Sequence, residues 1–160
     1  MELLANLGST FVSRCMDLLL GRDRLKLYVM WGSQPNADEI GTFLCLNVKV
    51  VNPGNTSIFF ERIEAVDRNG ETYFPLYWGL KAGHEIPPKN NVVGRIPCGH
   101  VAKPEMKELR VYDATERRYR LRGRGLRKVV RGLIEEIDRL EGLGFEVHSR
   151  KTRERRKSTS

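Results

Sequence analysis

The sequence predicts a mainly β protein, a seven-strand antiparallel β-sandwich with one amphipathic helix at each end. Two observations carry this prediction. Between residues 25 and 121, short apolar segments with a two-residue period alternate with turn signals, and no helical pattern intervenes. Before and after this region the apolar residues change to the three- and four-residue spacing of helices. A small closed β-barrel with a C-terminal helix fits the same pattern and is the structural alternative.

Length and composition are those of one folded domain with appendages. The chain has 160 residues, of which 40% are hydrophobic, enough to bury a core. Three scattered cysteines, Cys15, Cys45 and Cys98, predict free thiols, with a single disulfide between Cys45 and Cys98 as the alternative. No secretory signal and no apolar run long enough for a bilayer is visible, so we expect a soluble, cytoplasmic protein without membrane association.

Residues 1–21 form the first predicted element, an amphipathic helix. Its apolar residues follow a spacing of three and four: Leu4, Leu7, Phe11, Cys15 and Leu18. Gly21 then stands where helices commonly end in a left-handed conformation. We expect this helix to dock on the domain, with a partner protein or a second copy as the alternative contact.

The β-sandwich domain is predicted over residues 25–121, and its centre is residues 41–77. Leucine and valine at alternate positions from 44 to 50 indicate a strand with one buried face. Asn52-Pro53-Gly54-Asn55 supplies a turn, and Asn69-Gly70 predicts a two-residue hairpin. The strands are predicted over residues 25–31, 41–51, 58–66, 71–78, 92–98, 109–112 and 118–121.

The segment 71–78 has two features of its own. Pro75 cannot donate a ladder hydrogen bond, so this strand is expected at a sheet edge or at a bulge. Its aromatic residues alternate, which places Tyr73 and Tyr77 on one face and Phe74 and Trp78 on the other. One set is expected to pack in the core and the other is a candidate binding platform, and Tyr73 and Tyr77 are candidates for partner binding. Residues 79–91 and 99–107 are expected to be irregular connections.

A second amphipathic helix is predicted over residues 124–142. Its apolar stripe consists of Leu126, Val130, Leu133, Ile137 and Leu140. The stripe is a candidate surface for docking on the sandwich, for a partner protein or for self-association between copies. Glu135 is expected to pair with Arg131 and with Arg139 one turn away. Residues 145–160 are polar and charged and are predicted to be a basic disordered tail.

Two turns resemble those of a known class of domains. A strand ending in Val51-Asn52-Pro53-Gly54-Asn55 and followed by Ile58-Phe59-Phe60 resembles the second hairpin of many small immunoglobulin-like domains. The run from Val111 to Tyr119 resembles their closing hairpin, with Glu116 where glycine is more usual. Such domains occur in many uncharacterised bacterial and phage proteins. The resemblance covers residues 25–121 and implies an immunoglobulin-like sandwich but no activity.

Basic character is confined to the last quarter of the chain. Residues 1–116 hold 13 Lys and Arg against 14 Asp and Glu, whereas residues 117–160 hold 15 against 6. The cations that cluster before and within the second helix are Arg117, Arg118, Arg120, Arg122, Arg124, Arg127, Lys128 and Arg131. Cations at a helix N-terminus oppose the helix dipole, which suggests an external anionic partner, although a solvated charged surface is the commoner explanation. A phosphate backbone is the polyanion we expect, bound without sequence specificity.

No catalytic, cofactor or metal site is predicted. Cys98 and His100 lie close in sequence but lack a third orienting group, and His84 does not complete a metal-ligand spacing with them. The glycines of residues 122–125 lack the context of a phosphate-binding loop. We therefore expect a non-catalytic module for protein–protein interaction or structure. The alternative is a nucleic-acid-associated accessory protein that binds phosphates through its basic C-terminal quarter.

Overall fold

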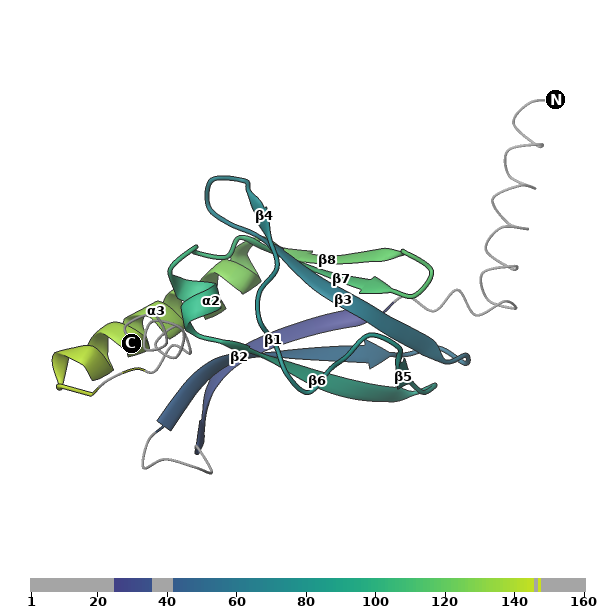
Figure 1. Cartoon of the computed structure of the whole chain (residues 1–160), viewed down its shortest axis with the longest axis horizontal. Helices are drawn as coiled ribbons and strands as arrows, with labels where there is room; N and C mark the ends of the chain where they lie inside the picture. Colours follow the sequence, from purple (N-terminus) through teal and green to yellow (C-terminus); the bar gives the residue numbers. More distant parts are fainter. Residues whose placement is uncertain (1–24, 36–41, 146, 148–160) are drawn as a thin grey trace, which may run out of the picture.

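The computed structural model describes residues 25–35, 42–145 and 147. In this part the chain is mainly β, with antiparallel sheets and one long helix (Figure 1). The prediction of a mainly β, antiparallel protein is confirmed at this level. The helix predicted over residues 1–21 lies outside the described residues, as does the predicted tail apart from residues 145 and 147.

The first sheet has three antiparallel strands in the order β1-β2-β6. These strands are β1 (Lys26–Pro35), β2 (Thr42–Asn52) and β6 (Asn90–Pro97). Side chains on successive residues point to opposite faces, so one face of β2 is lined by Leu44, Leu46, Val48 and Val50. All four are buried, as their alternation predicts.

The second sheet has the order β4-β3-β7-β8, and β5 also pairs with β3. Its strands are β3 (Ile58–Val66), β4 (Thr72–Tyr73), β5 (His84–Ile86), β7 (Glu108–Asp113) and β8 (Arg118–Arg122). The chain changes sheet after β2. At this crossing the buried Asn52 side chain donates to the carbonyl oxygens of Thr56 and Ile86, at 2.7 and 2.9 Å.

The prediction of a strand over residues 71–78 is wrong in length, because β4 ends at Tyr73. The chain then crosses to the first sheet, where Trp78 and Arg95 of β6 exchange two backbone hydrogen bonds of 3.0 and 2.9 Å. Pro75, buried between these two points, has no N–H to donate, so the ladder with β3 does not continue through it. The expected edge position is correct, since β4 ends the sheet.

Two short elements lie where irregular connections were expected. β5 pairs with β3 within residues 79–91, and the one-turn helix α2 (Gly99–Ala102) lies within residues 99–107. The described residues thus contain eight strands where seven were predicted. A strand of three residues is too short to display a period in sequence, which is why β5 gave no signal.

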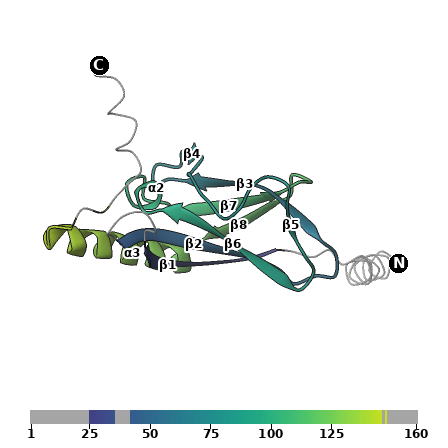
Figure 2. The same ribbon diagram turned by 60° about the horizontal axis from the view of Figure 1, so that its bottom comes forward.

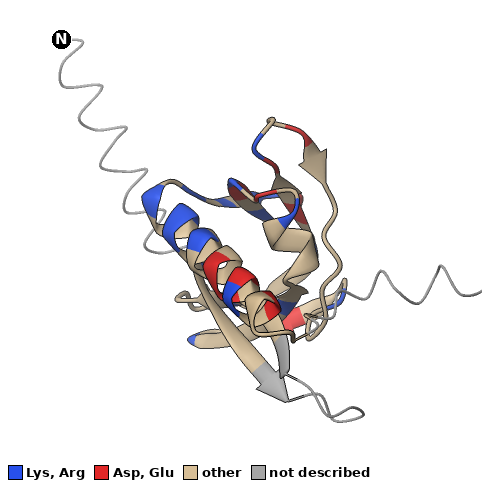
Figure 3. Cartoon of the chain, turned by 90° about the vertical axis from the view of Figure 1, so that its left-hand side faces the viewer, with Lys and Arg blue, Asp and Glu red and all other residues tan. Residues whose placement is uncertain are grey.

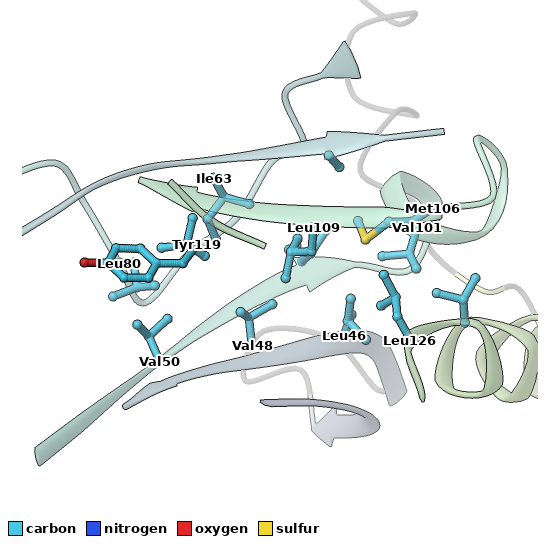
Figure 4. Packing of buried hydrophobic residues seen from close by; sticks show 14 of the residues in the cluster. Leu46, Val48, Val50, Ile63, Leu80, Val101, Met106, Leu109, Tyr119 and Leu126 are labelled. Carbon is cyan, nitrogen blue, oxygen red and sulfur yellow. The ribbon is translucent and has the colours of Figure 1, made fainter. Parts of the chain in front are cut away.

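The core lies between the two sheets. Leu46, Val48 and Val50 of β2 point towards Ile63 of β3 and Leu109 of β7 (Figure 4). Apolar area removed from water contributes about 25 cal/mol per Å², so this shared layer is the main stabilising contact between the sheets.

One side of this core is covered by α3 (Arg124–Gly142), whose bounds match the predicted helix. Leu126, Val130 and Leu133 are buried in the core, and Ile137 and Leu140 pack against it. The helix contacts β1, β8 and α2. The apolar stripe therefore has its packing partner within the chain.

The turn before α3 depends on Gly123, which adopts a φ of +96°, in the region that favours glycine. The expected pairing of Glu135 with Arg131 and Arg139 is wrong for the described helix. Arg139 instead donates to Glu136, three residues earlier, at 2.6 and 2.9 Å.

The close approach of α3 to β1 depends on a second glycine. A Cβ atom at Gly132 would lie 2.8 Å from Nε1 of Trp31, closer than non-bonded atoms tolerate. Gly125 in the same helix has no atom within 4 Å of such a Cβ. Gly132 therefore faces the Trp31 side chain of β1, whereas Gly125 faces open space.

We predict that Gly132→Ala and Gly125→Ala have opposite effects on stability. In Gly125→Ala the alanine favours the helix, and the free energy of unfolding rises by about 0.5 kcal/mol. In Gly132→Ala the Trp31 ring is displaced, and the free energy of unfolding falls by about 1 to 2 kcal/mol. Urea unfolding measures both, and a red shift of Trp31 emission in a Trp78→Phe background reports the displacement. Equal stabilisation by both substitutions would contradict the packing described.

Candidate nucleic-acid interface

The edge strand β8 displays a row of arginines. Tyr119 is buried, so the two-residue period of the strand points Arg118, Arg120 and Arg122 the other way, and all three are exposed. Arg117 is exposed in the preceding turn. The alternation of the strand thus turns a run of basic sequence into one cationic face.

The position of β8 is held by Asp113 at the end of β7. This carboxylate, only 5% exposed, accepts hydrogen bonds from the Thr115 N–H and hydroxyl at 2.9 and 2.6 Å. It also accepts from the Arg117 N–H at 3.0 Å and the Tyr119 hydroxyl at 2.9 Å. Glu116, which lies between Thr115 and Arg117, adopts a φ of +60°, a conformation in which glycine is more usual.

Burial alone would raise the pKa of Asp113, but the hydrogen bonds from Thr115, Tyr119 and the Arg117 backbone outweigh it and hold this pKa below its ordinary value. Burial, and then the Asp113 carboxylate, raise the pKa of Tyr119 to about 12. Tyr119 therefore remains a hydrogen-bond donor at neutral pH. The turn therefore depends on an ionised carboxylate, and both of its oxygens accept hydrogen bonds.

Carboxylates elsewhere on the outer face of the second sheet are already paired. Arg62 bonds Glu64 at 3.0 Å and Glu116 at 2.9 Å, and its guanidinium lies 4.0 Å from the centre of the Tyr112 ring. Arg110 bonds Glu108 at 2.6 Å. These pairs neutralise β3 and β7, so the charge of β8 at the edge is left uncompensated.

The first turns of α3 extend the cationic surface. Arg124, Arg127, Lys128 and Arg131 are exposed on the side away from the buried stripe. Figure 3 shows Lys and Arg over these turns and mainly Asp and Glu over the later ones. We call the following set the basic surface: Arg118, Arg120, Arg122, Arg124, Arg127, Lys128 and Arg131. Within residues 25–35, 42–145 and 147, none of the seven forms an ion pair with a carboxylate.

The predicted partner-binding residues are buried in the core or packed against it. Leu126, Val130 and Leu133 belong to the core, and Ile137 and Leu140 pack on it. Tyr73 donates through its hydroxyl to the carbonyl oxygen of His100 at 2.8 Å. Tyr77 meets Phe60 edge to face, with ring centres 5.8 Å apart.

Burial raises the pKa values of both Tyr73 and Tyr77, so they are the core-facing set of the predicted alternation. The exposed set begins with Phe74, at 69%, and includes Leu76, at 55%. Leu76 was not singled out from sequence, although the same alternation places it on this face.

The two cysteines among the described residues, Cys45 and Cys98, do not form a disulfide. Cys45 and Cys98 are both free and buried, and burial raises the pKa of each. Cys98 donates its N–H to the Leu44 carbonyl, so it lies opposite Leu44, whose side chain is in the core. Cys45, one residue on, points to the other face. The two sulfurs therefore lie on opposite sides of the sheet.

We predict that Asp113→Asn lowers the free energy of unfolding at pH 7 by about 1 to 3 kcal/mol, because an amide cannot accept all four hydrogen bonds. Since the folded-state pKa of Asp113 is depressed, its contribution is present above the ordinary pKa of about 3.9 and is lost as pH falls through the folded value. Denaturant unfolding between pH 2 and 7 should show a steeper loss of stability in wild type than in Asp113→Asn. Parallel profiles would contradict this role.

No group of His, Cys, Asp and Glu that could hold a metal ion occurs among the described residues. No helix in the described part is long and apolar enough to cross a membrane. Compared with protein-family models, curated proteins and solved structures, the chain matches none of them.

Proposed function

We propose that the protein is a non-catalytic, nucleic-acid-associated module that binds the phosphate backbone through its basic surface. The observation that carries this proposal is that seven exposed cations on β8 and α3 have no carboxylate partner among the described residues. Binding to a cationic surface of this kind releases counterions from the nucleic acid and is independent of base sequence.

The charge pattern of α3 supports an anionic partner. Its first turn holds Arg124 and Arg127 and no acidic residue, although the helix dipole is positive there. A cation in the first turn costs about 0.3 to 1 kcal/mol relative to an acidic residue at the same place, and the effect fades beyond that turn. A bound phosphate backbone offsets this cost at the N-terminal end.

A protein-interaction module with the α3 stripe as its docking surface is less well supported. That stripe packs on the chain's own core, so a partner would have to displace α3 from the sandwich. The basic surface needs no rearrangement to meet a polyanion.

An immunoglobulin-like identity of the sandwich is part of the proposal. The first, second and sixth strands share one sheet, and the third, seventh and eighth share the other. Immunoglobulin domains divide their strands in the same way: strands A, B and E lie in one sheet, and strands C, F and G lie in the other. This fold presents surfaces for binding but specifies no ligand.

We predict that binding to a fluorescein-labelled mixed-sequence DNA duplex is strongly salt-dependent. If all seven cations contact phosphates, log Kd changes with log salt with a slope of up to about 6. Arg124→Gln with Arg127→Gln should weaken binding and reduce this slope by up to about 2, since each lost phosphate contact removes about 0.9. Fluorescence anisotropy at several salt concentrations measures both quantities.

The matched control is Lys81→Gln with Lys103→Gln, which removes the same net charge from exposed positions outside the basic surface. This pair should leave the slope within about 0.5 of wild type. Absence of binding by wild type at low salt overturns the proposal. Equal losses in the two double variants also overturn it, because net charge alone would then be responsible.

A further inference from the structure

The outer face of the first sheet, turned away from the core, carries aromatic and cationic side chains. Tyr28 and Met30 of β1 are 55% and 66% exposed, and Lys26 and Lys49 are also exposed. Because Tyr28 and Met30 are this exposed, no described helix or strand covers them. It lies on the opposite side of the sheet from Leu46 and Val48.

Strand register aligns the members of this face in rows. One row joins Tyr28 to Lys49. The next row runs across the whole sheet through Met30, Asn47, Arg95 and Trp78. Trp78 shares the face with Arg95 because residues that exchange two backbone hydrogen bonds place their side chains on the same side of a sheet.

The face is cationic without compensating acids. Along β1, β2 and β6 its residues include Lys26, Lys49 and Arg95, and none of the described ones is Asp or Glu. None of these three cations forms an ion pair with a described carboxylate. The Nε atom of Arg95 is buried and has no hydrogen-bond partner among the described residues, so the fold does not use this guanidinium group as a donor through Nε.

A sheet face that combines an exposed aromatic ring with cations fits unpaired nucleotides. Bases stack on aromatic side chains whatever their identity, and the neighbouring cations attract the phosphates. A duplex keeps its bases stacked on one another, so it can use the cations of such a face but not the ring. An acid-free face also disfavours a second copy of this basic chain, because like charges would meet.

The outer face adjoins the basic surface. β1 is the edge strand of its sheet and contacts both β8 and α3. In Figure 2 the N-terminal end of α3 lies beside β1. A nucleic acid strand that extends from the outer face across the edge at β1 therefore passes beside the two elements that carry the basic surface.

We infer that the outer face of β1-β2-β6 binds single-stranded nucleic acid, with an unpaired base stacked on Tyr28 and phosphates held by Lys26, Lys49 and Arg95. This inference rests on the proposed function, since the basic surface supplies the general attraction to phosphates. The outer face adds a preference for single strands over duplexes.

The test compares a labelled oligothymidylate with a labelled duplex of equal length, using the full chain and fluorescence anisotropy. Tyr28→Ala should weaken oligothymidylate binding by roughly tenfold, the loss of one stacked base, and leave duplex binding within about twofold. Tyr28→Phe keeps the ring and should bind like wild type. Phe74→Ala removes another exposed aromatic side chain, one that directly follows β4 of the second sheet, and should change neither affinity. Thermal unfolding of each variant confirms that the fold is retained.

The outcomes separate the two proposals. If neither ligand binds, the proposed function fails and the inference fails with it. If both ligands bind but Tyr28→Ala leaves the oligothymidylate affinity unchanged, or weakens both ligands equally, the inference is overturned and the proposed function stands. If sedimentation shows a dimer that Met30→Glu dissociates, the face is occupied by a second copy and the inference is also overturned.

Discussion

The packing of α3 against the side of the two-sheet core is the contact on which the proposed function depends. Burying side chains such as Leu126, Val130 and Leu133 stabilises the folded state by about 1.5 to 3 kcal/mol each. A helix held by one face must present the opposite face to solvent. Because the cations of α3 repeat at helical spacing on that opposite face, burial of the stripe is what orients them outward. The same contact brings the helix beside β1 and β8.

Local patterns were sufficient to predict the elements whose signals lie within one segment. β3 and α3 occur at the predicted bounds, because an apolar period and adjacent turn or glycine residues define each of them. Pairing between distant segments was not predictable. Residues 71–78 alternate as a strand should, yet the partner of Trp78 is Arg95 in the other sheet, so the chain leaves β3 after Tyr73. Alternation reports an extended backbone and two faces, but it does not report which strand lies alongside.

The basic surface and the outer face of the first sheet also depend partly on contacts between distant segments. The basic run was visible in composition, but its uncompensated charge depends on contacts across strands. Arg62 and Arg110 are neutralised by glutamates, whereas Arg131 does not form the helical pair with Glu135 that its spacing favours. The outer face of the first sheet had no sequence signal, because its members are spread over separate strands. Only the register places them in common rows.

The two surfaces differ in the physical range over which they act. Attraction between the basic surface and phosphates extends over about a Debye length, roughly 8 Å at physiological salt, and does not depend on base sequence. Stacking on Tyr28 requires contact and an unpaired base, so it acts only after the strand has arrived. High salt therefore weakens the first step more than the second. The selectivity for single strands should therefore rise with salt even as both affinities fall, and it should rise by more than the shallower salt dependence of single strands alone produces.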